Sequence, residues 1–243
     1  MSVTASIFAG WGHDFPELLG GLVVALKLTG LSLLLGYPLG LLSAVSTNSK
    51  NRLVNVPGFI FVEFGRGVPL LVFLYLVYQG LPETGLSLSA FLSAVAAFAW
   101  STAAYSSEMF RSSLNAVPAG QREAALACGM SQPDTFRFVL MPQAMRIAIP
   151  PLLNLAVQMF QATALAYVIS VPEIMQRAYF LGTVSFQYMN VFVAAALLYA
   201  AVTLPSSALI GRLEKRLSRH VAQQATEKKP IWRRGRGPRR ASA

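Results

Sequence analysis

The chain has 243 residues, of which 54% are hydrophobic and only 12% are charged, with a mean hydropathy of +0.52. Soluble domains carry roughly 25% charged residues, so this composition excludes an ordinary soluble protein and indicates a membrane protein. The net charge is +10, and much of the excess follows the last apolar segment. That tail has few aromatic residues, so it indicates a cytoplasmic end and not a nucleic-acid-binding region.

Five apolar segments follow one another, at residues 18–44, 56–78, 88–109, 147–169 and 188–210. Each reaches the roughly 20 residues that a helix needs to cross a hydrocarbon core. The segments are continuously apolar and do not alternate, which argues against strands. We therefore expect an all-α fold, a polytopic membrane helix bundle of about five transmembrane helices within residues 18–210.

The polar flanks predict the orientation. Residues 1–17 contain no Lys or Arg, so they do not resemble a cleaved signal peptide and are expected outside the cytoplasm. Lys50 and Arg52 follow the first segment, whereas the connections after the second and fourth segments have almost no basic residues. The positive-inside rule then places the N-terminus outside and residues 211–243, a basic tail, in the cytoplasm.

Two of the predicted spans are irregular. Pro69 lies inside the second segment, and Pro150 and Pro151 lie near the start of the fourth. Proline frees a backbone carbonyl and kinks a membrane helix. The third segment is rich in Ala and Ser, which permits close helix packing. A kinked, tightly packed bundle suits a gated transporter, but inert bundles share these features.

The connection at residues 111–146 is the most informative part of the chain. It is polar, contains Gly and Pro, and has the composition of a helix. Because it is long for a simple connection, we expect it to contact a partner outside the bilayer. Its residue Cys128 is the only cysteine, so no intrachain disulfide can form, and a small packing role is expected.

Several kinds of chemistry have no signature in the sequence. There is no glycine-rich phosphate loop ending in Gly-Lys-Ser/Thr, so the chain is not itself an ATPase. The two histidines, His13 and His220, lie at opposite ends, and no metal-ligand cluster is visible. We therefore predict no catalytic residue, no bound cofactor and no metal, and we expect any ATP hydrolysis on a partner subunit.

Four fragments, in order, resemble one family. They are RGVPLL at residues 66–71, AYSSEMFR at 104–111, GQREAALACG at 120–129 and MPQAMRIAIPP at 141–151. Together they resemble the permease subunits of bacterial ATP-binding-cassette importers for polar amino acids, the family that carries histidine, glutamate, glutamine, arginine or opines. The resemblance covers about residues 18–217 and implies the type I importer permease fold.

The resemblance implies that the Glu-Ala-Ala segment is a short cytoplasmic coupling helix that docks in a groove of the ATPase. Small alanines would leave room for close approach, a carboxylate would pair with the ATPase, and a glycine would permit a tight turn. The residues concerned are Gln121, Arg122, Glu123, Ala124, Ala125, Gly129 and Pro142. Glu-Ala-Ala by itself is also typical of any helix.

The resemblance further implies partners and a location. The expected partners are two ATPase subunits, a second permease that is identical or paralogous, an extracytoplasmic solute-binding protein and membrane lipid. The expected location is the inner (plasma) membrane of a bacterial cell, where transport would proceed by alternating access. The alternative is a membrane interaction or sensory protein whose basic tail binds anionic lipid.

Charged residues in the spans are candidates for gating or substrate contact. Glu63 and Arg66 are three residues apart and can share a helix face, next to Pro69. They form either an interfacial pair with a snorkelling arginine or a gate. Glu108 is an ionisable group near membrane depth, which either contacts a cationic substrate or pairs with Arg111.

The fourth segment departs from the family pattern. Where the family often reads LKDTSL, residues 160–165 read FQATAL, so the charged pair is absent. If these positions line the pathway, the lining is neutral, and an atypical amino acid or a derivative such as a compatible solute or an opine becomes a candidate substrate. Gln158, Gln161 and Thr163 remain as polar candidates for the cavity, or as hydrogen-bonding groups between helices.

Overall fold

The computed structural model describes residues 11–226, and every regular element in that range is helical, as predicted. The α-helices are α2 (Trp11–Thr47), α3 (Arg52–Gly67), α4 (Leu70–Tyr75), α5 (Ala90–Ala116), α6 (Ala119–Ala127), α7 (Gln132–Asp134), α8 (Met141–Ala162), α9 (Ile174–Ser185) and α10 (Tyr188–Thr226). Two π-helical turns, η1 (Leu76–Gly80) and η3 (Thr135–Leu140), and two 3-10 turns, η2 (Leu81–Thr84) and η4 (Thr163–Ile169), complete the described elements.

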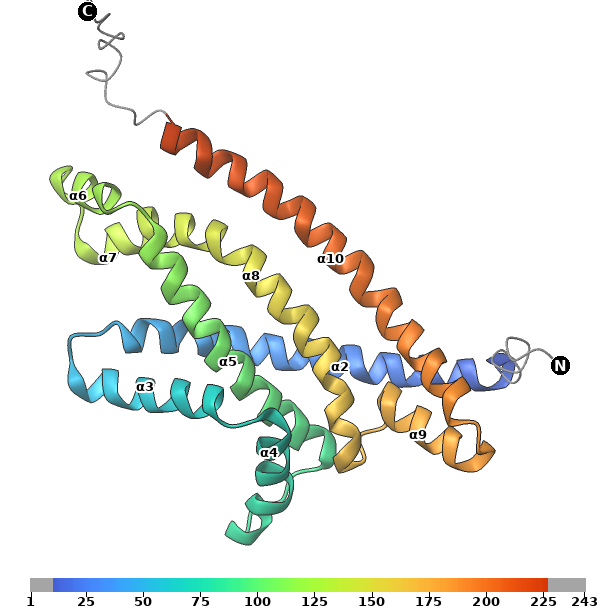
Figure 1. Cartoon of the computed structure of the whole chain (residues 1–243). Coiled ribbons are helices and arrows are strands. Elements are labelled where there is room, and N and C mark those ends of the chain that lie inside the picture. Colours follow the sequence, from blue (N-terminus) through green and yellow to red (C-terminus); the bar gives the residue numbers. More distant parts are fainter. Residues whose placement is uncertain (1–10, 227–243) are drawn as a thin grey trace, which may run out of the picture.

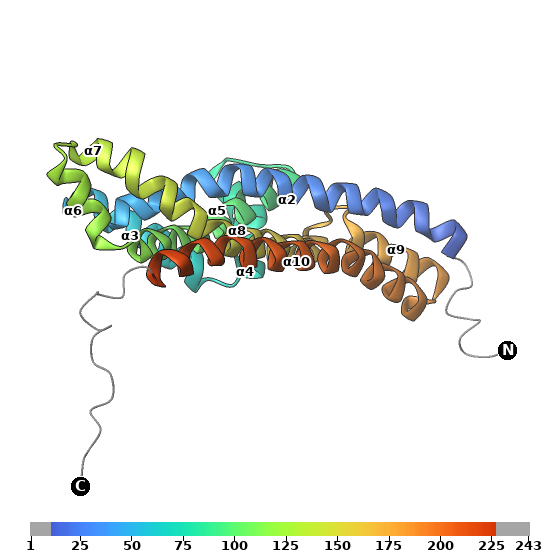
Figure 2. The same ribbon diagram turned by 90° about the horizontal axis from the view of Figure 1, so that it is seen from above.

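The helices form an elongated bundle with two distinct ends (Figure 1). The long helices α5, α8 and α10 run in a similar direction, and α2 crosses them. One end carries α6, α7, the connection from α2 to α3 and the C-terminal end of α10. The other end carries α9 and the start of α2, and the view from above in Figure 2 agrees.

Within the described residues, three helical segments are long and apolar enough to cross a membrane: Phe15–Thr47, Gln132–Ile169 and Tyr188–Leu217. A fourth span arises if α3 and the α4–η2 segment, which meet at a bend of 107°, are counted as one broken span. The remaining predicted span corresponds to α5, which is 27 residues long and contains fourteen buried residues. Its many Ser and Thr side chains lower its hydropathy, and its central position hides them from lipid.

The predicted span at residues 56–78 is not a single kinked helix. Instead, α3 ends at Gly67, Val68 and Pro69 are extended, and α4 begins at Leu70 in a new direction. Proline has no N–H to donate and disfavours the helical conformation of the residue before it, so the helix stops at this point. Pro69 therefore breaks the span, which is a stronger effect than the expected kink.

Other boundaries also differ from the predicted ones. The helix of the fourth segment starts at Met141 and passes through Pro150 and Pro151 without a break before it tightens into η4. Helix α9 occupies the connection between the fourth and fifth predicted segments. Helix α10 continues to Thr226, so the first part of the predicted tail is helical, and residues 227–243 lie outside the described range.

Small residues hold α2 and α5 together at the centre of the bundle. A Cβ atom added at Gly40 would lie 2.0 Å from the Ser106 Oγ and 2.8 Å from the Ala103 carbonyl oxygen. One added at Gly36 would lie 2.6 Å from the Thr102 Cβ. The backbones can approach this closely only because the facing residues are small. The small residues of the third predicted segment thus serve close packing.

Candidate functional site

A helical hairpin follows α5 at one end of the bundle and contains the Glu-Ala-Ala segment (Figure 1). Its first arm is α6, which ends in a Schellman motif: the Gly129 amide donates to the Leu126 carbonyl at 3.0 Å and the Met130 amide donates to the Ala125 carbonyl at 3.1 Å. Gly129 has φ of +81°, a conformation that residues with a Cβ adopt poorly. Ser131 then caps α7, because its Oγ accepts from the Asp134 amide at 3.2 Å.

Two side-chain hydrogen bonds connect the arms of this hairpin. The Arg122 Nη2 donates to the Gln132 Oε1 at 2.9 Å, and the Gln143 Nε2 donates to the Gln121 Oε1 at 3.3 Å. Two of the residues assigned to coupling, Gln121 and Arg122, therefore bond within the hairpin. Ala125 is only 7% exposed, so it packs inside the structure and does not lie on the open face.

The open face of α6 presents Glu123 and Ala124, both of which are exposed. Glu123 makes no hydrogen bond or ion pair with any residue in the described range. A free carboxylate beside a methyl-sized side chain, on a short helix outside the apolar spans, is suited to close docking of another protein. Pro142 is also exposed, at the second position of α8.

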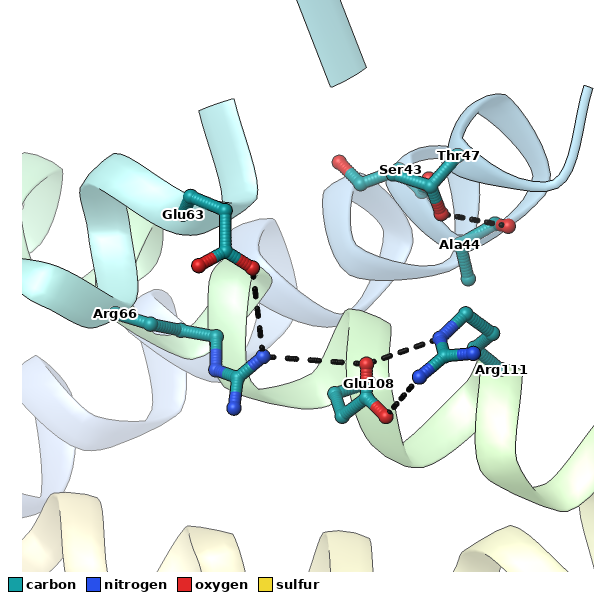
Figure 3. A network of polar contacts seen from close by, with 7 residues as sticks. All are labelled: Ser43, Ala44, Thr47, Glu63, Arg66, Glu108 and Arg111. Atoms are coloured by element: carbon teal, nitrogen blue, oxygen red, sulfur yellow. Dashed lines mark hydrogen bonds and ion pairs between the residues drawn. The ribbon is translucent and has the colours of Figure 1, made fainter. Parts of the chain in front are cut away.

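A network of four charged side chains joins α3 to α5 (Figure 3). Arg111 Nε donates to Glu108 Oε2 at 3.0 Å, and Arg111 Nη2 donates to Glu108 Oε1. Arg66 Nη1 lies 3.9 Å from Glu108 Oε2 and 3.8 Å from Glu63 Oε1. Of the two interpretations of Glu108, the structure therefore shows the ion pair with Arg111. Arg66 connects this pair to Glu63.

This network lies at the C-terminal end of α3, whose last residue is Gly67, and in the C-terminal half of α5. Arg66 is fourteen residues after the start of α3 and Glu108 is eight residues before the end of α5. At about 1.5 Å per residue, Arg66 lies about 21 Å from the start of α3, and Glu108 lies about 12 Å from the end of α5. The four side chains are 37% to 53% exposed in the single chain. Charges at membrane depth require water or another protein chain on their open side.

A second polar feature is a row of amide side chains on α8. Gln158 and Gln161 are exposed, and so is Asn154, four residues before Gln158. Residues at this spacing share one face of a helix. None of the three amides hydrogen-bonds to a residue in the described range. Thr163 differs, because it is fully buried and its Oγ1 donates to the Phe160 carbonyl at 2.7 Å.

We refer to Asn154, Gln158 and Gln161 as the amide row. Sequence reasoning missed Asn154, although its four-residue spacing from Gln158 was a usable signal. The structure thus adds one residue to this surface and places Thr163 inside the protein, away from it.

Glu173, at the opposite end of the bundle, was also missed. Its side chain is fully buried, and its two carboxylate oxygens accept from the Met175 amide at 2.9 Å and the Gln176 amide at 2.7 Å. The Tyr199 hydroxyl of α10 donates to the same carboxylate at 2.7 Å. Burial raises the pKa of Glu173, and these hydrogen bonds oppose the rise. Glu173 therefore caps α9 and connects it to α10.

The side chains of the described residues contain no group of three or more His, Cys, Asp or Glu that could hold a metal ion.

Comparison with known proteins gives a consistent family. Residues 36–219 match the model of the binding-protein-dependent transport system inner membrane component. The probable amino-acid ABC transporter permease protein YckA of Bacillus subtilis is 36% identical over 209 residues, which cover 86% of this chain and 92% of YckA. The L-cystine transport system permease protein TcyB of the same organism is 36% identical, with 86% and 90% covered.

A solved structure of an amino acid ABC transporter with histidines shares the fold, with a TM-score of 0.82 and 32% identity, over 86% of this chain and 98% of that one. The resemblance found in the sequence fragments is thereby confirmed, as is the type I importer permease fold. The chain belongs to the family of binding-protein-dependent transport system inner membrane components.

Proposed function

We propose that this chain is the permease subunit that forms the translocation pathway for a polar amino acid or an amino-acid derivative, driven by a separate ATPase that docks on α6. One observation carries the proposal: the short helix α6, which lies outside the apolar spans, holds Glu123 and Ala124 on an open face, with no partner for Glu123 in the described residues. A second chain is needed to complete this surface.

The pathway itself is proposed to follow the polar surfaces at membrane depth. The amide row on α8 and the open side of the Glu63–Arg66–Glu108–Arg111 network are polar, exposed in the single chain and unsuited to contact with lipid. A second permease subunit beside this one would enclose them around water. In this arrangement Gln158 and Gln161 line the pathway, whereas Thr163 supports α8 from inside.

The distribution of basic residues supports the orientation. Lys50 and Arg52 belong to the connection from α2 to α3, and Arg122 belongs to α6, so all three lie on the side of the bundle that carries α6 (Figure 1). By the positive-inside rule this end faces the cytoplasm, where an ATPase would be available. The N-terminus and α9 then lie on the outer side, where we propose that an extracytoplasmic solute-binding protein delivers the substrate.

The proposed coupling has a direct mechanical route. Only Val117 and Pro118 separate α5 from α6, so a displacement of α6 is passed to α5. Helix α5 carries Glu108 and Arg111, which connect through Arg66 to the helix that breaks at Pro69. ATP binding, with Mg²⁺, and ATP hydrolysis would take place on two copies of the partner ATPase, and α6 would convert their closure into alternating access.

The substrate class rests on the relatives and on the charge of the lining. YckA is named as a probable amino-acid permease and TcyB as an L-cystine permease, so an amino-acid substrate is proposed here. The amide row carries hydrogen-bonding groups but no net charge. A zwitterionic amino acid or a neutral derivative fits such a lining better than a strongly charged solute.

The alternative of a lipid-binding sensory protein is not favoured. The family match covers residues 36–219 and accounts for the membrane bundle and the hairpin without assigning a role to the tail. Deletion of residues 222–243 is expected to leave ATPase assembly intact. Loss of assembly in that deletion would show that the tail is structural.

The test uses a tagged chain, purified gently from its native membranes, with Glu123→Arg compared with wild type. A matched control is Glu83→Arg, which reverses an exposed carboxylate in the connection between α4 and α5. We expect a P-loop ATPase to co-purify with wild type and with Glu83→Arg but not with Glu123→Arg. No ATPase with wild type, under conditions that preserve a control transporter, would overturn the proposal.

A further inference from the structure

The hairpin exposes one large aromatic side chain. Phe138, on the π-helical turn η3, is 61% exposed, more than any other large hydrophobic residue of the hairpin. The turn packs beside α6, so Phe138 belongs to the same end of the molecule as Glu123. Leu126, at the end of α6, is also exposed. The hairpin thus presents apolar as well as charged side chains at this end of the molecule.

The backbone around Phe138 has an unusual geometry with a local cause. Pro142 has no N–H, so it cannot bond to the carbonyl of Phe138, four residues before it. The helix instead widens over Thr135–Leu140, and the Met141 amide bonds back to the Phe136 carbonyl. Such π-turns insert a residue into a helix and frequently occur at functional sites. Here the widened turn carries Arg137 and Phe138, which are both exposed.

Lipid is a poor partner for this side chain. Phe138 precedes Ile147, the start of the predicted apolar segment, by nine residues. Along a helix this is about 13 Å beyond the hydrocarbon core, whereas the headgroup layer adds only about 5 to 7 Å on each side. The exposed Arg146 lies between them. The candidate span Gln132–Ile169 also contains Phe138, but its 38 residues correspond to about 57 Å of helix against a hydrocarbon core of about 30 Å, so we expect the end that carries Phe138 to extend beyond the core.

We propose that Phe138 and Arg137 form a second docking contact for the ATPase, continuous with the open face of α6. The proposal rests on the proposed function and adds to it a contact outside the Glu-Ala-Ala helix. The Arg137 Cζ lies 5.4 Å from the centre of the Phe138 ring, so the cation stacks on the aromatic face. Aromatic and arginine side chains are the residues that most often dominate binding at protein interfaces.

The complementary surface is defined by this chemistry. It is an apolar pocket on the ATPase, rimmed by acidic or carbonyl groups that accept from Arg137. Because η3 lies at the side of α6, the pocket lies next to the groove that receives Glu123 and not within it.

The first experiment places the photoreactive amino acid benzoylphenylalanine at position 138 of the full-length chain in the assembled transporter. The matched control carries it at Phe180, which is 57% exposed on α9 at the other end of the bundle. We expect illumination to join position 138, but not position 180, to the ATPase subunit. Cross-links from position 138 to lipid alone, in a complex that retains the ATPase, would overturn the proposal.

The second experiment measures the affinity of the purified ATPase for permease variants in lipid nanodiscs. Phe138→Ala is expected to weaken binding by about tenfold or more, which is typical of an interface anchor, whereas Phe180→Ala should leave it unchanged. Equal affinity in the two variants would refute the second contact while leaving docking at Glu123 intact. Absence of ATPase binding in the wild-type chain would instead refute the proposed function, so the two failures are distinguishable.

Discussion

Replacing Glu173 by alanine should destabilise the end of the bundle that carries α9. The fully buried carboxylate accepts the Met175 and Gln176 amides at the start of α9 and the hydroxyl of Tyr199 on α10. Loss of a helix N-cap costs about 1 kcal/mol. Leaving the partly buried tyrosine hydroxyl without an acceptor costs about 1 to 2 kcal/mol more. We therefore expect a loss of about 2 to 3 kcal/mol.

The assay is thermal unfolding of the purified chain in detergent or nanodiscs. For a protein of this size, each 1 kcal/mol shifts the melting temperature by roughly 2 to 4 °C, so Glu173→Ala should melt about 4 to 12 °C lower. Glu173→Gln keeps an acceptor oxygen and should lose less than half of that. If Glu173→Ala melts within about 1 °C of wild type, the carboxylate does not hold α9 to α10 and the reasoning is wrong.

Three further predictions follow from the packing, the backbone and the charge. In Gly40→Leu the new Cβ would meet Ser106 and Ala103, so we expect a loss of stability of about 1 to 3 kcal/mol, measured by thermal unfolding. The control is Gly30→Leu in the same helix, which should be tolerated because no atom lies within 4 Å of the added Cβ. Gly129→Ala, at φ of +81°, should cost about 1 kcal/mol and reduce ATPase recovery; Gly120→Ala is the control, and equal recovery would contradict a role for the turn. Because burial raises the pKa of Glu173 above its ordinary 4.5, the folded protein holds this proton more tightly than the unfolded chain. The contribution of this protonation to stability is present below pH 4.5 and is lost as the pH rises through the raised pKa of Glu173. The melting temperature should therefore vary less with pH over that range in Glu173→Gln than in wild type.

The sequence by itself determined the class of the protein and its family. Apolar segments of about 20 residues have few alternatives in a bilayer, because every backbone polar group must bond within the segment, so the all-α membrane fold followed from composition and length. The Glu-Ala-Ala helix and the turn at Gly129 were recognisable because helix composition and glycine act locally, over a few residues each, whereas the Ser131 cap was seen only in the structure.

Only the tertiary structure decided which polar side chains are satisfied. Glu108 had two interpretations in the sequence; Arg111, three residues later on α5, pairs with it, and the packing of α3 against α5 adds Arg66 as a second partner. Thr163 and Gln161 looked equivalent as pathway candidates, yet one is buried and bonded to Phe160 while the other is exposed. The importance of Glu173 depends on Tyr199, which is 26 residues away on another helix. Local signals reveal turns, caps and apolar segments, whereas burial and pairing are properties of how helices pack, and distant residues set them.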